Sequence, residues 1–305
     1  MAWVVARTKI EVWNGSYYAD LTEIINDDGS YNSAGKYNVR SVSGLGSARV
    51  REITNRGPAQ HGDTFLDFRY ESRKIQLVFD GLGTTEATWH DRRAELLRIF
   101  KPSRSLIQFR YSRPPDRVYQ WDCSVSIPPQ YSSDDRIGFN QRAVVELTCH
   151  NPFPYDPEGV SVPFALAGGG TGFVVPAVTP FTFGLSTLNV TSTISLNDVA
   201  AVDSFPIITL TGPVNTPVIT NNTTGDTLAF TTNLGSGTTY TIDLRYGYKS
   251  VVDQLGAIKT GDLSSVSDLA TFSLVPGTNS ITVTGTSAAA ATAITFQYYP
   301  YFIGP

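Results

Sequence analysis

Hydrophobic and polar residues alternate in the stretch RKIQLVFDGL, residues 73–82. Ile75, Leu77 and Phe79 fall on one face of an extended chain, and the residues between them fall on the other. A period of two is typical of a strand with one buried face. We therefore predict a half-buried β-strand here.

The pattern changes to a helical period over residues 84–102. Five residues recur at spacings of four, three, one and three and so share one side of the predicted helix: Trp89, Arg93, Leu96, Leu97 and Phe100. Thr84 or Thr85 can cap the start, and Lys101 and Pro102 close the end.

Residues 107–111 and 118–125 alternate again on either side of a RPPD turn, which predicts a β-hairpin. Residues 143–150 read as a further strand, in which Cys149 shares a face with Val145 and Leu147. Neighbours in a strand point to opposite faces, so Cys149 and His150 cannot act on each other as nucleophile and base. Three prolines follow by residue 157, and we expect the first domain to end there.

The second half of the chain consists of short Thr-rich segments separated by Gly, Asn and Pro. Strands at this spacing, without a helical period, indicate an antiparallel β-sandwich. Residues 269–305 carry no charge, so we expect the final strands to be central in a sheet or covered by a neighbour.

Charge and composition divide the chain at about the same place. Residues 1–158 hold 20 Lys and Arg and 20 Asp and Glu, whereas residues 159–305 hold 3 Lys and Arg and 7 Asp and Glu. Threonine rises from 8 to 26 across the same boundary. We therefore predict a β-rich domain with one helix over residues 1–157, a linker or the start of the second domain over 158–200, and the sandwich over 201–305.

These totals also exclude some functions. Neither half has the clustered basic charge with which proteins neutralise phosphates, so no specific nucleic-acid readout is expected. The start, MAWVVAR, is too short for a signal-peptide core. Residues 159–197 are uncharged, but 19 of these 39 are Gly, Pro, Ser or Thr, which indicates an extended connector and no membrane anchor.

The sequence points to no catalytic, metal-binding or cofactor-binding residues. His61 with Asp63 lacks a second ligand cluster, residues 26–30 (NDDGS) lack the alternate acids of a calcium loop, and residues 168–172 (GGGTG) lack a phosphate-loop context. A hydrolase would depend on one of the three histidines: His61, His90 and His150. Cys123 and Cys149 are either a cross-strand pair or two core thiols.

Binding surfaces are better supported than catalysis. Tyr240 and Tyr246 alternate in register with a core face, which favours packing, yet Tyr246 and Tyr248 are also candidate glycan contacts. Three arginines of the predicted helix form a solvated face or contact a neighbouring subunit: Arg92, Arg93 and Arg98.

The order of these segments resembles the distal tail proteins of siphovirus-type bacteriophages. In the first domain the resemblance rests on residues 73–82, the helix, the hairpin, and the ending VVELTCHNPFPYDP. In the second it rests on PIITLTGPVNTPVITNNTTGDTL, YTIDLRYGYKSVVDQLG and FSLVPGTNSITV. The long connector at 159–197 departs from the family pattern.

The resemblance implies a mainly β protein with a galectin-like second domain and no enzymatic activity. It further implies a ring of subunits, usually six, in the virion tail, assembled in the host cytoplasm. Its partners would be copies of itself, the tail tube protein, a tail-tip hub or tail-associated protein, and a receptor-binding protein, with DNA crossing the central channel. The alternative is a carbohydrate-binding protein that contacts host glycans through the sandwich.

Overall fold

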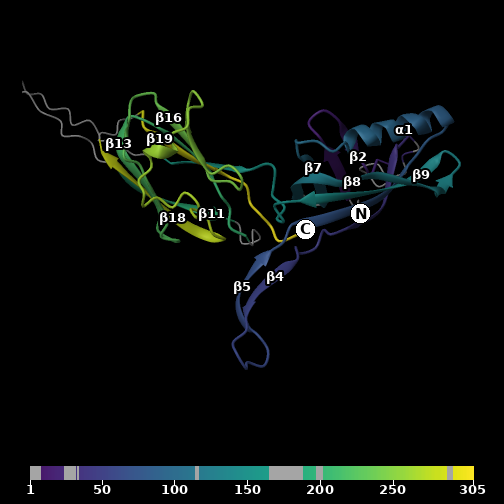
Figure 1. Ribbon diagram of the computed structural model, residues 1–305. Helices are drawn as coiled ribbons and strands as arrows, with labels where there is room; N and C mark the ends of the chain where they lie inside the picture. Colours follow the sequence, from purple (N-terminus) through teal and green to yellow (C-terminus); the bar gives the residue numbers. More distant parts are fainter. Residues whose placement is uncertain are drawn as a thin grey trace, which may run out of the picture. The chain divides into compact units, whose positions relative to one another are not determined.

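The computed structural model describes residues 8–23, 32, 34–113, 117–164, 188–196, 202–286 and 291–305, with backbone alone at 113 and 132–135. The chain divides into two compact units. The first comprises Met1–Pro157 together with Phe302–Pro305, and the second comprises Glu158–Tyr301. The last four residues thus pack with the first unit, although the sequence placed them in the sandwich. The mainly β fold with one described α-helix follows the expected class (Figure 1).

The first unit is built on an antiparallel sheet with the strand order β2-β1-β7-β8-β9-β6-β3. Its strands are β1 Lys9–Trp13, β2 Tyr18–Asp20, β3 Tyr37–Ser43, β6 Arg73–Gly81, β7 Ile107–Arg113, β8 Arg117–Ile137 and β9 Asn140–Cys149. The predicted alternation in β6 is confirmed, because Ile75, Leu77 and Phe79 are fully buried. β7 and β8 form the predicted hairpin, with Phe109 opposite Trp121.

Helix α1, Glu86–Ile99, packs its apolar side into this core. Thr85 is the N-cap, and its hydroxyl accepts a hydrogen bond from the backbone N–H of Thr88. Trp89, Leu96 and Ile99 are the buried residues of the helix. The expectation for Leu97 is wrong, because its side chain is 48% exposed while Ile99 takes the core position.

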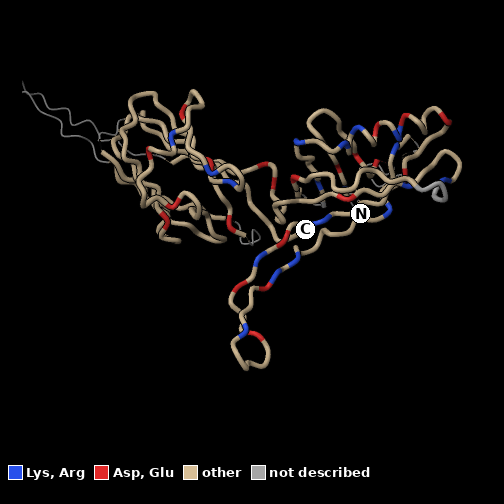
Figure 2. The backbone as a smooth tube through the Cα atoms, viewed as in Figure 1, with Lys and Arg blue, Asp and Glu red and all other residues tan. Residues whose placement is uncertain are grey.

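Two further strands, β4 Val50–Asn55 and β5 Thr64–Tyr70, form a separate two-stranded sheet in the first unit. We call residues 50–70 the arm. It extends from the rest of this unit, and both its strands carry charges of both signs (Figures 1 and 2). Most side chains of both strands are exposed, so the arm contributes little to the hydrophobic core of the unit.

The second unit contains two antiparallel sheets that share one hydrophobic core. One has the order β10-β19-β12-β16-β17, and the other has the order β11-β18-β13-β14 with β15 paired to β13. The strands are β10 Val160–Phe164, β11 Leu188–Leu196, β12 Ile207–Thr211, β13 Val214–Asn221, β14 Thr227–Ala229, β15 Asn233–Leu234, β16 Thr239–Asp243, β17 Ser250–Asp253, β18 Gly277–Thr286 and β19 Ala293–Tyr298. A 3-10 turn, η1, spans Thr260–Asp262. The expected sandwich is therefore present.

The stretch 158–200, expected to be a linker or the start of the second domain, contributes two strands to the second unit. Residues 160–164 form strand β10, which pairs with β19, and residues 188–196 form β11, which pairs with β18. Both segments belong to the sandwich. The stretches 26–30 and 168–172 and the first seven residues lie outside the described residues. No helix in the described part of the chain has the length and apolar character to cross a membrane.

Candidate interaction surfaces

The cysteines and histidines do not assemble into a reactive centre in the described chain. Cys149 lies in the core face of β9, directly opposite Cys123 of β8, and both thiols are free and fully buried. Burial is the main cause that raises the pKa of the Cys123 thiol, and the contact with Cys149 raises this pKa further. His150 is exposed, and its Nε2 lies 3.1 Å from the Ser124 hydroxyl. The two neighbours therefore face apart, as the strand period requires.

The other two histidines are also isolated. His61 is exposed in the loop of the arm, and His90 is exposed on α1, where its ring lies 4.5 Å from that of Trp89. Within the described ranges, no group of three or more His, Cys, Asp or Glu side chains is placed to hold a metal ion. The surfaces of the molecule are thus the features to consider for function.

The arm presents large apolar side chains to solvent. Phe65 and Leu66 are each 58% exposed, and Phe68 and Val50 are exposed to a similar degree. The root of the arm is ordered, because Tyr70 packs edge-on against Phe153 with ring centroids 4.9 Å apart. Large apolar side chains exposed together on one element are typical of protein interaction sites.

The root is fixed by a buried cation, Arg73, at the start of β6. Its guanidinium donates hydrogen bonds to five backbone carbonyl oxygens, those of Gly44, Leu45, Gly46, Pro152 and Ile303. Gly44 has a φ of +87°, and a Cβ there would lie 1.9 Å from the Lys74 carbonyl oxygen. Glycine is therefore required where the chain turns from β3 into the arm.

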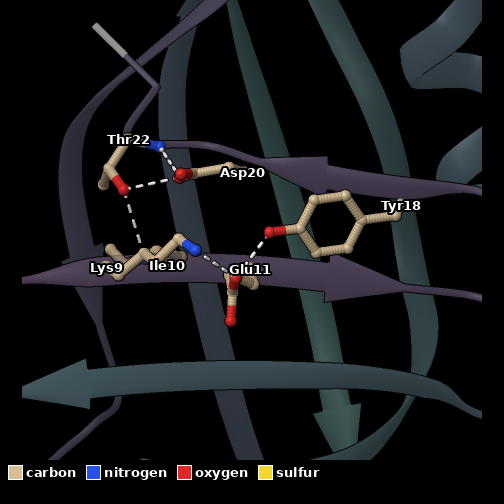
Figure 3. A network of polar contacts seen from close by, with 6 residues as sticks. All are labelled: Lys9, Ile10, Glu11, Tyr18, Asp20 and Thr22. Atoms are coloured by element: carbon tan, nitrogen blue, oxygen red, sulfur yellow. Dashed lines mark hydrogen bonds and ion pairs between the residues drawn. The ribbon is translucent and has the colours of Figure 1, made fainter. Parts of the chain in front are cut away.

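A polar network lies on the outer face of the sheet at β1 and β2 (Figure 3). The Tyr18 hydroxyl donates to Glu11 Oε1 at 2.5 Å, and Lys9 Nζ lies 2.7 Å from the same oxygen. Burial alone would raise the pKa of Glu11, but the contacts with Lys9 and Tyr18 and the charge of Arg110 outweigh it, so that the pKa is lowered. Glu11 is therefore a carboxylate at neutral pH.

A hollow of about 340 Å³ lies beside this network. It is lined by Glu11, Val12, Trp13, Tyr18, Gln108 and Arg110. We call it the Trp13 hollow. Trp13 and Tyr18 are both exposed, whereas the side-chain oxygen of Gln108 is buried without a hydrogen-bond partner. No local sequence pattern marks this site, because it depends on the register of three strands.

The three helix arginines differ in their surroundings. Arg92 Nη1 lies 3.2 Å from Glu95 Oε2, and Arg93 stacks over the rings of Trp89 and Tyr131 at 5.0 and 4.4 Å. Both charges are engaged within the chain. Arg98 is exposed, and its side chain has no partner among the residues described. Of the three, Arg98 is the one open to a neighbour.

The candidate tyrosines of the second unit lie in the loop after β16. Tyr240 is buried within the strand, but β16 ends at Asp243, so the core position expected for Tyr246 is wrong. Tyr246 and Tyr248 are 57% and 61% exposed. Arg245 forms a two-point ion pair with Asp243 and lies over the Tyr248 ring at 4.5 Å.

Comparison with protein families identifies the two parts of the chain. Residues 21–149 match the phage tail protein RIFT-related domain, and residues 199–300 match the C-terminal domain of the siphovirus-type tail component. Together these domains define a structural component of a long-tailed phage virion. The chain belongs to the distal tail protein family of siphovirus-type bacteriophages. No curated protein sequence matches it.

Solved structures share the fold at low sequence identity. The crystal structure of the Dit protein (gp 19.1) of phage SPP1, described as a paradigm of hub adsorption apparatus, has a TM-score of 0.62 and 12% identity over 97% of this chain and 99% of that one. A chain of the phage p2 baseplate in its activated conformation with Sr has a TM-score of 0.51 and 10% identity over 95% and 98%. At these identities the likeness concerns the fold.

Proposed function

We propose that the chain forms a ring, with six subunits as in the family it resembles, that joins the tail tube to the baseplate or host-recognition proteins around a channel for DNA. The observation that carries the proposal is the arm. Phe65, Leu66 and Phe68 are exposed on an element that is anchored at its root and uncovered along its strands. A neighbouring copy is the partner that would cover them.

Ring closure is consistent with the physical character of the first unit. A head-to-tail contact, in which one surface of a subunit binds a different surface of the next, closes into a cycle when the rotation permits. The arm would provide one such surface, and Arg98 would add an exposed charge to a contact of α1. The equal numbers of acidic and basic residues over 1–158 would leave a channel without the basic charge that traps phosphates.

The test is the assembly state of the full chain carrying Phe65→Asp and Phe68→Asp. We expect rings with a central hole in negative-stain images of the wild type, and loss of those rings in the double variant with its thermal unfolding unchanged. Leu255→Asp is the matched control, because Leu255 is 87% exposed in the second unit. Rings that persist in the double variant at wild-type abundance would overturn the role given to the arm.

A second candidate function is glycan contact by the sandwich through Tyr246 and Tyr248. The observation that favours it is their exposure, in one loop with the Arg245–Asp243 ion pair. Exposed aromatic rings beside fixed polar groups suit a sugar ring and its hydroxyls. Glycan-array binding by the full chain that is lost in Tyr248→Ala would support this function, and an array without signal would contradict it.

A further inference from the structure

The Trp13 hollow is formed by two rows of side chains on neighbouring strands. In the register of β2, β1 and β7, Tyr18 lies opposite Trp13 and Trp13 opposite Gln108. Glu11 lies opposite Arg110 in the next row of the same face. Val12 and Phe109, which alternate with these residues, are buried in the core. The sheet itself therefore holds the lining residues in place.

Several hydrogen-bonding atoms of the hollow are unused within the described chain. Lys9 and Tyr18 both contact Oε1 of Glu11, which leaves Oε2 free (Figure 3). The Gln108 Oε1 atom is buried without a partner. Arg110 uses Nε to donate to Gln120 at 2.7 Å, and its terminal nitrogens have no partner in the described residues. The hollow thus offers an acceptor on Glu11 and donors on Arg110 beside an exposed indole ring.

We propose that the Trp13 hollow binds a neutral pyranose ring of a saccharide. The apolar face of a sugar ring covers an indole, while its hydroxyls donate to Oε2 of Glu11 and accept from the terminal nitrogens of Arg110. The volume of about 340 Å³ falls at the lower end of ligand pockets, roughly 300 to 1,000 Å³. This site lies in the first unit, apart from the tyrosines of the sandwich, and does not depend on ring formation.

An apolar protein segment fits the same hollow less well. It would cover Trp13, but it would also bury Oε2 of Glu11 and the terminal nitrogens of Arg110 without supplying polar partners. Burying such groups unpaired costs about 1–3 kcal/mol each, and more for a charge. A ligand rich in hydroxyl donors removes this cost, which is why a saccharide is the occupant that the lining chemistry favours.

The experiment is saturation-transfer NMR and calorimetry on the full chain with methyl glycosides of glucose, galactose and N-acetylglucosamine. We expect millimolar binding of at least one of them and at least a tenfold weaker affinity in Trp13→Ala. Arg110→Met is the second variant. It removes the donors of the hollow at the expense of one hydrogen bond to Gln120, so the thermal midpoint should fall only slightly while sugar affinity falls at least tenfold. A residue with a merely structural role would leave the affinity unchanged.

Leu255→Ala is the matched control, because Leu255 is an exposed apolar side chain of the other unit and has no part in either candidate sugar site. Three outcomes overturn the proposal: no binding of any glycoside, binding lost in Tyr248→Ala but retained in Trp13→Ala, or binding only of a polyanionic glycerol-phosphate polymer. Loss of rings in Trp13→Ala without any sugar binding by the wild type would assign the hollow to a second copy instead. Immobilised cell-wall polysaccharide is tested beside the free methyl glycosides. Binding of both shows that an internal sugar ring is accepted, and binding of the glycosides alone shows that a single or terminal ring is required.

Discussion

Arg73 and Ile303 are 230 positions apart in sequence, yet Nη2 of Arg73 donates a hydrogen bond to the Ile303 carbonyl oxygen at 2.7 Å. The same guanidinium binds carbonyls at the root of the arm and at Pro152, after β9. Arg73 is 3% exposed, and its described contacts include no carboxylate. One buried cation therefore joins the last residues of the chain to the arm and to the end of the sheet.

Replacing Arg73 by methionine should destabilise the first unit by about 3 kcal/mol or more, because several buried carbonyls lose their donor at once. Thermal unfolding followed by circular dichroism measures the effect. Lys74→Met is the control, since Lys74 forms only an exposed ion pair with Glu146, worth about 0–1 kcal/mol. Equal midpoints for the two variants would contradict the role of Arg73.

Asn14 should be required for the end of helix α1. Its side-chain nitrogen donates to the carbonyls of Arg98 and Ile99 at 3.0 and 2.8 Å, which satisfies two groups that the helix leaves unpaired. Asn14→Ala should cost about 1 kcal/mol in chemical denaturation. Asn14→Asp should cost more, because it places a negative charge at the negative end of the helix dipole. An aspartate variant as stable as wild type would refute this account.

Stability should depend on the ionisation of Glu11. Its folded pKa is lowered, so its contribution is present above the unfolded value of about 4.3 and is lost as the pH falls through the folded pKa. Wild type should therefore exceed Glu11→Gln in thermal midpoint at pH 7, and the difference should shrink at acid pH. Scans of both proteins between pH 7 and pH 3 measure it, and a constant difference would argue against the lowered pKa.

The two thiols should be unreactive in the folded protein. Cys123 and Cys149 are fully buried, and the raised pKa of Cys123 leaves little thiolate to react. A chromogenic disulfide reagent should label neither thiol within minutes at pH 8, and both in guanidinium. Tyr248→Cys places a thiol at a site that is 61% exposed in wild type and should react at once. Fast labelling of the native wild type would show that the core opens around these strands.

The sequence period was informative wherever one face of an element is buried. It predicted the core faces of β6 and β9, including Cys149, because alternation with a period of two follows directly from strand geometry. It was wrong about Leu97. On a helix, Leu97 and Ile99 lie about 80° to either side of Trp89, so both border the apolar stripe. Tertiary packing decides which of these two residues is buried, and the helix periodicity alone does not.

Other features could not be predicted because they have no local pattern. The arm buries neither face, so Phe65, Leu66 and Phe68 show no alternation that marks them as strand residues. The Trp13 hollow requires the pairing register of β2, β1 and β7, and β7 lies far from the other two strands in sequence. The hydrogen bond of Arg73 with Ile303 forms because residues 302–305 return to the first unit. Neither the composition nor the periodicity of the sequence predicts this return.

That return makes the sandwich an insertion within the first unit, entered after Pro157 and left before Phe302. Phe302 stacks edge-on against Tyr119, and Arg117 lies over its ring. Any polypeptide fused after Pro305 would consequently emerge beside Gly44 and Gly46, where the arm begins, and not from the sandwich. An affinity tag that leaves the root of the arm undisturbed therefore belongs in an exposed loop of the sandwich.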